Sequence, residues 1–299
     1  MSLVARDPFT LIDGGLSTVL EEMGEEPSGL LWTAAALVDR PHVLTEAHRR
    51  YVEAGADVVI TASYQASEPG FVAAGLSVAD ARKALAATTA VARAAHAPSV
   101  AASVGPYGAY LGDGSEYHGT YAASWAEVRA FHRQRLEVLV DTAPDLFAIE
   151  TIPSVAEAEI VAEELRSLTD APAWLTFSCR DSSHTCAGDV FAVAAAAVAP
   201  AVDAVGVNCT APVHVLSLLH AAHVALPGVP LVVYPNHGAE WNGEHKCWLG
   251  PVGGSEIPGL VPDWLAAGAR FVGGCCGVGT AGIRALAALR DELAAGLAP

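Results

Sequence analysis

Eight short apolar runs, separated by alanine-rich stretches, constrain the fold of this chain more than any other feature of its sequence. Apolar and β-branched residues nearly fill each run, which is typical of strands that are buried on both faces of a parallel sheet. The runs span residues 9–13, 57–63, 99–105, 146–152, 173–179, 204–210, 230–236 and 270–276.

The stretches between the runs carry the signals that start and stop helices. Ser77, Ser124 and Ser154 each precede an acidic residue by three positions, which is the spacing of a capping box. In another stretch Pro41 stands in the first helical turn and Gly55 stands at the expected C-terminal stop. A last helix is expected over about 280–296 of the chain.

Eight β-α units in 299 residues match the number and size of a (β/α)₈ barrel. The alternative is a doubly wound open sheet, but the turn "DGGLST" after the first run lacks the G-x-G-x-x-G spacing of a dinucleotide loop. We therefore predict an α/β fold, a single TIM barrel, with residues 1–299 as one domain.

Charge and hydropathy exclude several classes of partner. The net charge is −17, and Lys83 and Lys246 are the two lysines, so the chain offers no basic stripe for nucleic acid and is repelled by anionic membranes. No apolar run approaches the roughly 18–20 residues of a membrane span, and the first residues lack the apolar core of a signal peptide. We expect a cytoplasmic monomer or small homo-oligomer that binds small molecules and keeps its cysteines reduced.

Three cysteines are expected to meet at one rim of the barrel, where the C-terminal ends of the strands lie. Cys209 lies at the end of the sixth run, and the adjacent Cys275 and Cys276 end the eighth, within a glycine-rich turn. Three thiolates with one open position form a typical catalytic zinc site, so these residues are predicted to hold Zn²⁺. A buried, inert position is the ordinary alternative for any cysteine, and it is kept for the other three, Cys179, Cys186 and Cys247.

Two carboxylates form a second group at the same rim. Asp13 and Glu150 end the first and fourth runs, with no basic residue next to them in the sequence. Asp13 fits a helix cap equally well, but the pair is also suited to gripping a substrate ammonium, with backbone N–H groups of the "DGG" turn near the substrate carboxylate. An amino acid that carries a thiol would fit both groups. Other candidate substrate contacts at the strand ends are Thr61, Ser63, Asn208 and Asn236.

The motifs that carry these residues resemble those of the homocysteine S-methyltransferase family along nearly the whole chain. They include "LIDGGLSTVLEEMG", "GPYGAYLGDGSEYHG", "ETIPSVAEAE", "GVNCTAP", "YPNHG" and "GGCCG". The resemblance implies a zinc ion held by the three rim cysteines. It also implies that Asp13, Gly14 and Glu150 hold homocysteine and that Asn236 lies close to the metal.

Two of the motifs also indicate a branch of the family. "GPYGAYLGDGSEY" and "ITASYQAS" resemble the branch that uses S-methylmethionine or S-adenosylmethionine, and the chain ends about one helix after "GGCCG", without the added modules of cobalamin-dependent or betaine-using relatives. The implied activity is methyl transfer from a sulfonium donor to homocysteine, giving methionine, with S-methylmethionine as the better donor. The alternatives are a zinc thiol methyltransferase that uses betaine or another thiol, and a zinc-holding thiol sensor, which the two carboxylates disfavour.

The long glycine-rich loop after the third run carries the candidate donor site. Tyr107, Tyr110 and Tyr117 could contact the donor cation with their ring faces. Asp113 or Glu116 could supply the counter-charge, and the loop would then act as a flexible lid. The alternative is a surface loop whose tyrosines serve only as hydrophobic anchors.

Overall fold

The computed structural model describes residues 5–25, 35–238, 240–242, 247–249 and 255–296. Within these ranges eight strands form one parallel sheet in the order β1-β10-β7-β6-β5-β4-β3-β2. The strands are β1 (Thr10–Leu11), β2 (Val58–Ile60), β3 (Ser99–Val104), β4 (Leu146–Ile152), β5 (Ala173–Phe177), β6 (Ala204–Asn208), β7 (Leu231–Tyr234) and β10 (Ala269–Val272).

The sheet closes into a barrel between β1 and β2, which stand at the two ends of this strand order. Ile12 forms a parallel bridge with Val58, and the backbone N–H of Asp13 donates to the Val58 carbonyl over 3.0 Å. Each predicted run coincides or overlaps with one of the eight strands, so the (β/α)₈ barrel is confirmed. Most strands are shorter than the runs because the last residues of these runs leave the ladder and form the rim.

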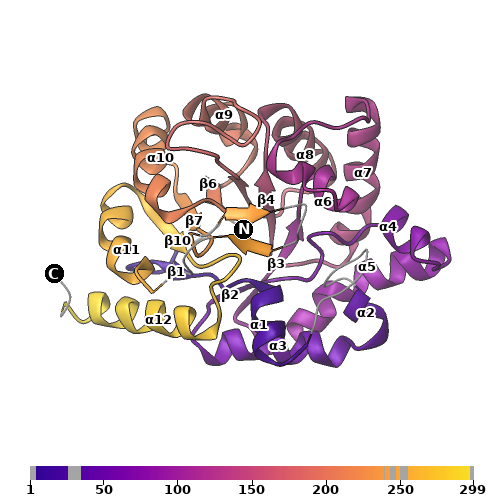
Figure 1. Cartoon of the computed structure of the whole chain (residues 1–299), viewed down its shortest axis with the longest axis horizontal. Helices are drawn as coiled ribbons and strands as arrows, with labels where there is room; N and C mark the ends of the chain where they lie inside the picture. The colour runs from indigo at the N-terminus through magenta and orange to yellow at the C-terminus, as the bar shows by residue number, and fades with distance from the viewer. Residues whose placement is uncertain (1–4, 26–34, 239, 243–246, 250–254, 297–299) are drawn as a thin grey trace.

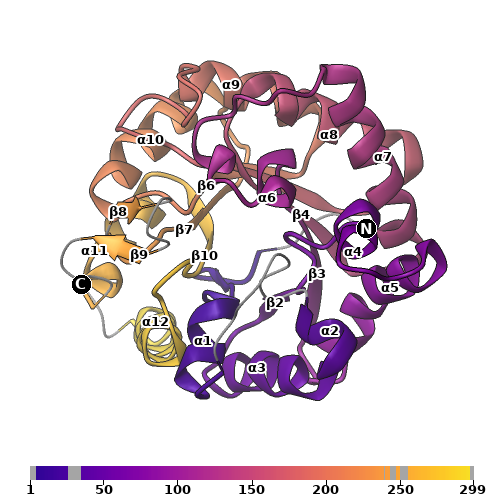
Figure 2. The same cartoon turned by 45° about the vertical axis from the view of Figure 1, so that its right-hand side comes forward.

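Helices surround the strands as an outer ring (Figures 1 and 2). The helices that cover the barrel wall are α3 (Pro41–Glu53), α5 (Val78–Arg93), α7 (Trp125–Asp141), α8 (Val155–Leu168), α9 (Phe191–Val198), α10 (Pro212–Ala225), α11 (Ile257–Ala266) and α12 (Thr280–Ala294). Shorter helical segments lie in the connections, namely α1 (Leu16–Glu22), α2 (Ala35–Asp39), α4 (Glu68–Ala73), α6 (Tyr107–Leu111) and the 3₁₀ turns η2 (Ser115–Tyr117) and η3 (Ala199–Ala201). Among the described helices, none is both long and apolar enough to cross a membrane.

The helix starts follow the predicted caps. Ser77, Ser124 and Ser154 are the N-cap residues of α5, α7 and α8, and the side chain of each accepts a backbone N–H three residues on. Ser124 forms the complete capping box with Glu127. Pro41 begins α3, and Gly55 adopts a φ of +106° just after it, which satisfies the backbone at the helix end without a Cβ clash.

One element was not expected from the sequence. A two-stranded antiparallel sheet, β8 (Glu240–Asn242) with β9 (Cys247–Leu249), is inserted between β7 and α11. The barrel interior is filled by a cluster of strand residues that includes Trp174, Tyr234 and Phe271, with the Trp174 and Phe271 rings 5.9 Å apart. These rings close the barrel from within, so polar side chains at the strand ends meet above a packed core rather than over a pore.

Candidate functional site

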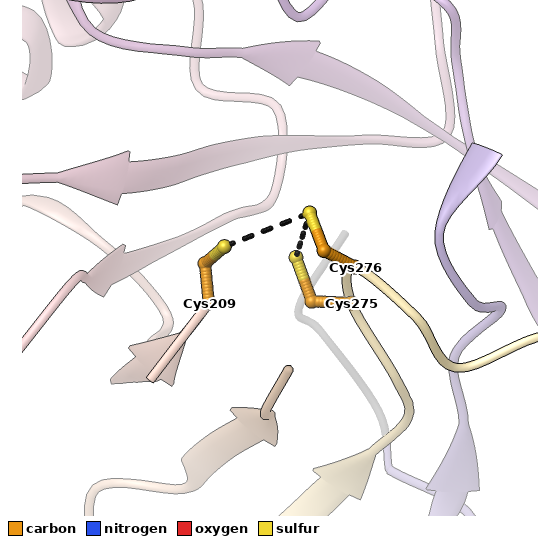
Figure 3. Close-up of side chains that lie close together, drawn as sticks. All are labelled: Cys209, Cys275 and Cys276. Carbon is orange, nitrogen blue, oxygen red and sulfur yellow. Dashed lines mark hydrogen bonds between the residues drawn. The ribbon is translucent and has the colours of Figure 1, made fainter. Parts of the chain in front are cut away.

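Three thiols converge at the C-terminal rim, as the sequence predicts. The Sγ atom of Cys276 lies 3.8 Å from that of Cys209 and 3.9 Å from that of Cys275, and all three sulfurs lie within 4.8 Å of one another. Figure 3 shows the three side chains pointing toward one another from two separate chain segments, after β6 and after β10. The group could hold a metal ion.

Local backbone conformation aims these sulfurs inward. Cys209 adopts a φ of +47°, an uncommon left-handed conformation for a residue with a side chain, while its N–H donates to the Tyr234 carbonyl over 3.2 Å. The N–H of Cys275 donates to the Pro235 carbonyl over 2.8 Å. Gly277 has a φ of +78°, and a Cβ there would lie 2.3 Å from the His237 ring, so only glycine allows the turn that presents both adjacent thiols.

The electrostatics of the cluster favour a bound cation. Hydrogen bonds among the three thiols shift their pKa values in both directions, and burial and the charge of neighbouring thiolates raise them, so that the pKa of each thiol lies well above its ordinary value. The thiols therefore stay protonated unless a positive charge compensates them. A metal ion supplies that charge and binds thiolates directly.

Glu150 lies near the C-terminal end of β4, and both of its carboxylate oxygens accept hydrogen bonds. Ser103 donates to Oε1, and the Tyr234 hydroxyl donates to Oε2 over 3.1 Å. Burial raises the pKa of Glu150 to about 7, against the lowering effect of these two hydrogen bonds and of Arg135. No described Lys, Arg or His forms an ion pair with it.

Asp13 is also a buried carboxylate, and it does not cap a helix. Its Oδ2 accepts the backbone N–H of Ile60 over 2.9 Å, whereas the N-cap of α1 is Gly15. Burial, with a smaller repulsion from Glu150, raises the pKa of Asp13 well above its ordinary value. The two carboxylates are therefore close enough to interact, which is the arrangement expected of a shared ammonium site.

The turn after Asp13 is tightly packed. A Cβ on Gly14 would lie 2.2 Å from the Val278 carbonyl oxygen, so this position excludes every other residue in the observed backbone. The N–H of Gly15 donates to the same carbonyl over 3.1 Å, and the Tyr51 hydroxyl donates to the Gly15 carbonyl over 2.7 Å. The N–H of Gly15 is therefore already used and is not free to hold a substrate carboxylate.

The remaining predicted contacts mainly support the rim. The Thr61 and Ser63 hydroxyls lie 2.7 Å apart, and Ser63 donates to the Ser103 carbonyl over 2.7 Å. Asn208 accepts the Thr176 hydroxyl over 2.7 Å.

Both asparagines lie beside the cysteines. The Asn208 amide donates toward Cys275 Sγ over 3.9 Å. Asn236 is buried, and its N–H donates to the carbonyl of Thr210, the residue after Cys209, over 3.2 Å. Direct contact of any of the four with substrate stays a prediction.

The tyrosines of the loop formed by residues 105–121 divide into two groups. Tyr107 packs edge to face on Tyr110 and on Phe131 of α7, and the Tyr110 ring is tilted against Phe131, with centroids 5.1–5.6 Å apart. Tyr117 instead places its hydroxyl 3.6 Å from Cys209 Sγ. Donor binding by all three stays a prediction, but only Tyr117 of the three has a recorded contact with the thiol cluster.

Two residues at the site were not singled out from the sequence. Ser103 and Tyr234 hold Glu150 through hydrogen bonds to its carboxylate. A weak signal existed for Ser103, because it is a polar residue inside an otherwise apolar run. Tyr234 offered no such signal, since an aromatic residue in a strand is ordinarily read as core.

Comparison with known proteins agrees with this geometry. The sequence pattern of the family described as homocysteine S-methyltransferase matches residues 10–289. A homocysteine S-methyltransferase 1 of Zea mays is 40% identical, covering 95% of this chain and 95% of its own length.

Solved structures give the same result. The metallated form of the Escherichia coli homocysteine methyltransferase MmuM superposes with a TM-score of 0.84 at 40% identity, covering 95% of this chain and 96% of that one. Its oxidised form superposes with a TM-score of 0.83 at 41% identity, covering 94% and 95%. Sequence and structure agree over nearly the full length, so the chain belongs to the homocysteine S-methyltransferase family.

Proposed function

We propose that this chain transfers a methyl group from a sulfonium donor to the thiol of L-homocysteine, giving methionine. The observation that carries the proposal is that a cluster of thiols and a pair of buried carboxylates lie at the same rim of the barrel. Three thiols form a cluster, and two buried carboxylates, Asp13 and Glu150, are close enough for their charges to interact. Homocysteine carries a thiol for the first group and an ammonium for the second.

Zinc is the proposed ion, because the cluster has the dimensions that it requires. A tetrahedral ion with zinc–sulfur bonds of about 2.3 Å places its sulfurs about 3.8 Å apart, and the recorded separations are 3.8 and 3.9 Å. The metallated form of the E. coli relative supports a metal in this family. When bound, zinc would hold the substrate sulfur at its fourth position and keep it deprotonated near neutral pH.

The side chains of the chain itself position homocysteine. Glu150 is oriented by Ser103 and Tyr234, so its carboxylate is held in place to accept the substrate ammonium. Asp13, held by the Ile60 N–H, adds a second charge from the rim after β1. Binding one cation relieves the desolvation and the mutual repulsion that raise both pKa values.

The reaction is a direct displacement. The thiol proton of homocysteine leaves to solvent before transfer, and the bond from its sulfur to the methyl carbon then forms as the bond to the donor sulfur breaks. The donor departs as a neutral thioether, which is a second methionine when the donor is S-methylmethionine. The protein contributes mainly alignment of the two sulfurs.

S-methylmethionine is the donor proposed as preferred, with S-adenosylmethionine used less well. Two other functions remain as outcomes of the same test. One is methyl transfer from betaine or to another thiol, and the other is a zinc-holding sensor without turnover. A reducing cytoplasm is the proposed setting, because the cluster works only with reduced thiols.

The test supplies reduced, zinc-loaded protein with homocysteine and one donor at a time, and measures methionine formed. We expect turnover with S-methylmethionine, a lower kcat/KM with S-adenosylmethionine, and none with betaine. Turnover with betaine alone would assign the chain to another activity. Zinc binding without methionine from any donor would support the sensor and refute the proposal.

A further inference from the structure

Glu116, in the 105–121 loop, is a carboxylate that forms no ion pair with the residues that the structure describes. It lies in η2, and its Oε2 atom is buried with no hydrogen-bond partner among the described residues. Burial raises the pKa of Glu116 to about 7, although the backbone groups of Glu116 and Gly114 act in the opposite direction. Keeping a carboxylate oxygen buried without a partner is unfavourable unless a ligand supplies one.

The surroundings of Glu116 connect it to the thiol cluster. Its charge acts on both Tyr64 and Tyr117, and the charge of Cys209 acts on the same two tyrosines. The Tyr117 hydroxyl lies 3.6 Å from Cys209 Sγ. Glu116 therefore lies beside the site, next in the chain to the tyrosine that contacts the Cys209 sulfur.

The loop that carries Glu116 is anchored at both ends. Glu157 of α8 accepts the N–H of Tyr107 over 2.5 Å and the hydroxyl of Tyr121 over 2.6 Å, and His132 Nε2 lies 2.9 Å from its Oε1. Inside the loop the chain passes so close to itself that a Cβ on Gly108 would lie 2.4 Å from the Glu116 nitrogen. The backbone at Glu116 is thus held in a defined position.

Asp113, the other acid of the loop, differs in every respect that matters here. It is exposed, and its Oδ1 accepts the N–H of Ser115 over 3.0 Å, which stabilises the turn. Its pKa is lowered, because hydrogen bonds from Ser115 outweigh the opposing effect of partial burial. Of the two counter-charges that the sequence left open, the structure therefore favours Glu116.

We propose that Glu116 binds the α-ammonium group of the methyl donor and so selects sulfonium donors that are α-amino acids. This inference rests on the proposed function and names the donor class of that same site. Buried Oε2 can accept a hydrogen bond from an ammonium N–H, and the next residue, Tyr117, places its hydroxyl 3.6 Å from Cys209 Sγ. Betaine has no N–H group, so it cannot form the contact.

The ammonium is a better partner for Glu116 than the sulfonium for a chemical reason. The sulfonium charge disappears during methyl transfer, so a carboxylate paired with it would stabilise the reactants more than the transition state. The ammonium keeps its charge throughout. Glu116 should then contribute uniform binding, which changes KM for the donor and leaves kcat alone.

The test compares wild type with Glu116→Gln, using S-methylmethionine and its desamino analogue, which keeps the sulfonium and lacks the ammonium. For S-methylmethionine we expect the variant to raise KM by about 10-fold to 100-fold, as for loss of a charge-assisted hydrogen bond, with kcat and the homocysteine KM within about twofold. For the desamino analogue the variant and wild type should have the same kcat/KM. Asp113→Asn removes one charge from the same loop and should behave as wild type.

Calorimetric titration of S-methylmethionine into protein without homocysteine adds a readout that is independent of turnover. Glu116→Gln should weaken this binding by the same factor as it raises KM. Equal losses with both donors, or an equal loss in Asp113→Asn, would overturn the inference. If wild type makes no methionine, the proposed function fails, and the titration alone then decides whether Glu116 recognises the ammonium.

Discussion

Both ends of the barrel carry carboxylates next to strand ends, but the two ends differ in whether a cationic side chain pairs with the carboxylate. At the N-terminal end Asp57 stands directly before β2, and its carboxylate accepts the N–H of Leu11 over 2.9 Å and bonds Arg6 and Arg290, each over 2.6 Å. Asp145 and Asp203, directly before β4 and β6, repeat the pattern by accepting an N–H from the start of the neighbouring strand, from Val100 over 2.8 Å and from Ala173 over 2.9 Å.

At the C-terminal end the carboxylates have no such compensation. Asp13 and Glu150 are buried, accept hydrogen bonds, and form no ion pair with any residue that the structure describes. Their pKa values are raised, so folding keeps two acids in positions that are unfavourable to their ionised forms. The comparison shows that one residue type serves stability where its charge is paired and ligand binding where it is not.

The largest expected effect comes from the thiols of the C-terminal end. Cys209→Ala, Cys275→Ala or Cys276→Ala should each lose metal and bring methyl transfer below detection, while the barrel stays folded because its core does not depend on a rim metal. Metal analysis and circular dichroism measure the two properties. Cys186→Ala, outside the cluster, is the matched control and should retain the metal. Full metal occupancy in one of the three variants would remove that residue from the ligand set.

Glu150→Gln should affect substrate binding strongly and metal content not at all. Without a negative charge at this position the substrate ammonium loses a buried partner, which is worth about 2–5 kcal/mol, so the homocysteine KM should rise at least about 30-fold. Steady-state kinetics at saturating donor measures it. A normal KM would mean that the ammonium is held elsewhere and that the two ends do not differ as argued.

The pH dependence of stability should reveal the same carboxylate in the metal-free protein. Because the pKa of Glu150 is about 7 when folded, against an ordinary value of 4.5, the folded state holds this proton more tightly. The contribution of Glu150 to the free energy of unfolding is fully present below about pH 4.5. As pH rises through about 7, this contribution falls by about 3 kcal/mol in total.

Urea unfolding at pH 5 and pH 8 measures this loss. In Glu150→Gln this position cannot titrate, so only wild type should lose this stability as pH rises. The free energy of unfolding of the variant, relative to that of wild type, should therefore be about 3 kcal/mol higher at pH 8 than at pH 5. A difference that does not change with pH would show that Glu150 is already charge-compensated in the free protein.

Asp57→Asn tests the N-terminal end and should give the reverse result. It weakens the contacts to Arg6 and Arg290 and the acceptor of the Leu11 N–H, so we expect a loss of about 2–3 kcal/mol of stability, as for hydrogen bonds to a charged group. Kinetic constants at a temperature where the variant is folded should match wild type. A changed homocysteine KM with unchanged stability would show that Asp57 serves substrate binding rather than stability, contrary to the contrast between the two ends.

The smallest expected effect concerns the residue that orients Glu150. Ser103→Ala removes the hydroxyl that donates to Oε1 and should raise the pKa of Glu150 further. The homocysteine KM should rise about fivefold, corresponding to about 1 kcal/mol for one hydrogen bond. Because Ser103 acts through Glu150, the effect should vanish in the Glu150→Gln background, and an additive effect there would give Ser103 a separate role.

Much of this site could be predicted from the chain because its signals are local. Cys275 and Cys276 are adjacent in a glycine-rich turn, and Cys209 and Glu150 end apolar runs, so the barrel rule alone brings them to one rim. The β8–β9 hairpin was missed, since it interrupts a β-α unit without changing the order of the eight runs.

The eight strands, the helix caps and the position of three thiols and two carboxylates at one rim follow from residue type and from position within a strand or helix, so they can be predicted from the amino-acid order. Tertiary structure alone decided which tyrosine faces the thiols, since Tyr107 and Tyr110 turn to Phe131 while Tyr117 reaches Cys209. It likewise decided which carboxylates find a cation. Charge compensation depends on side chains brought together from distant parts of the chain, and sequence spacing carries no information about those distances.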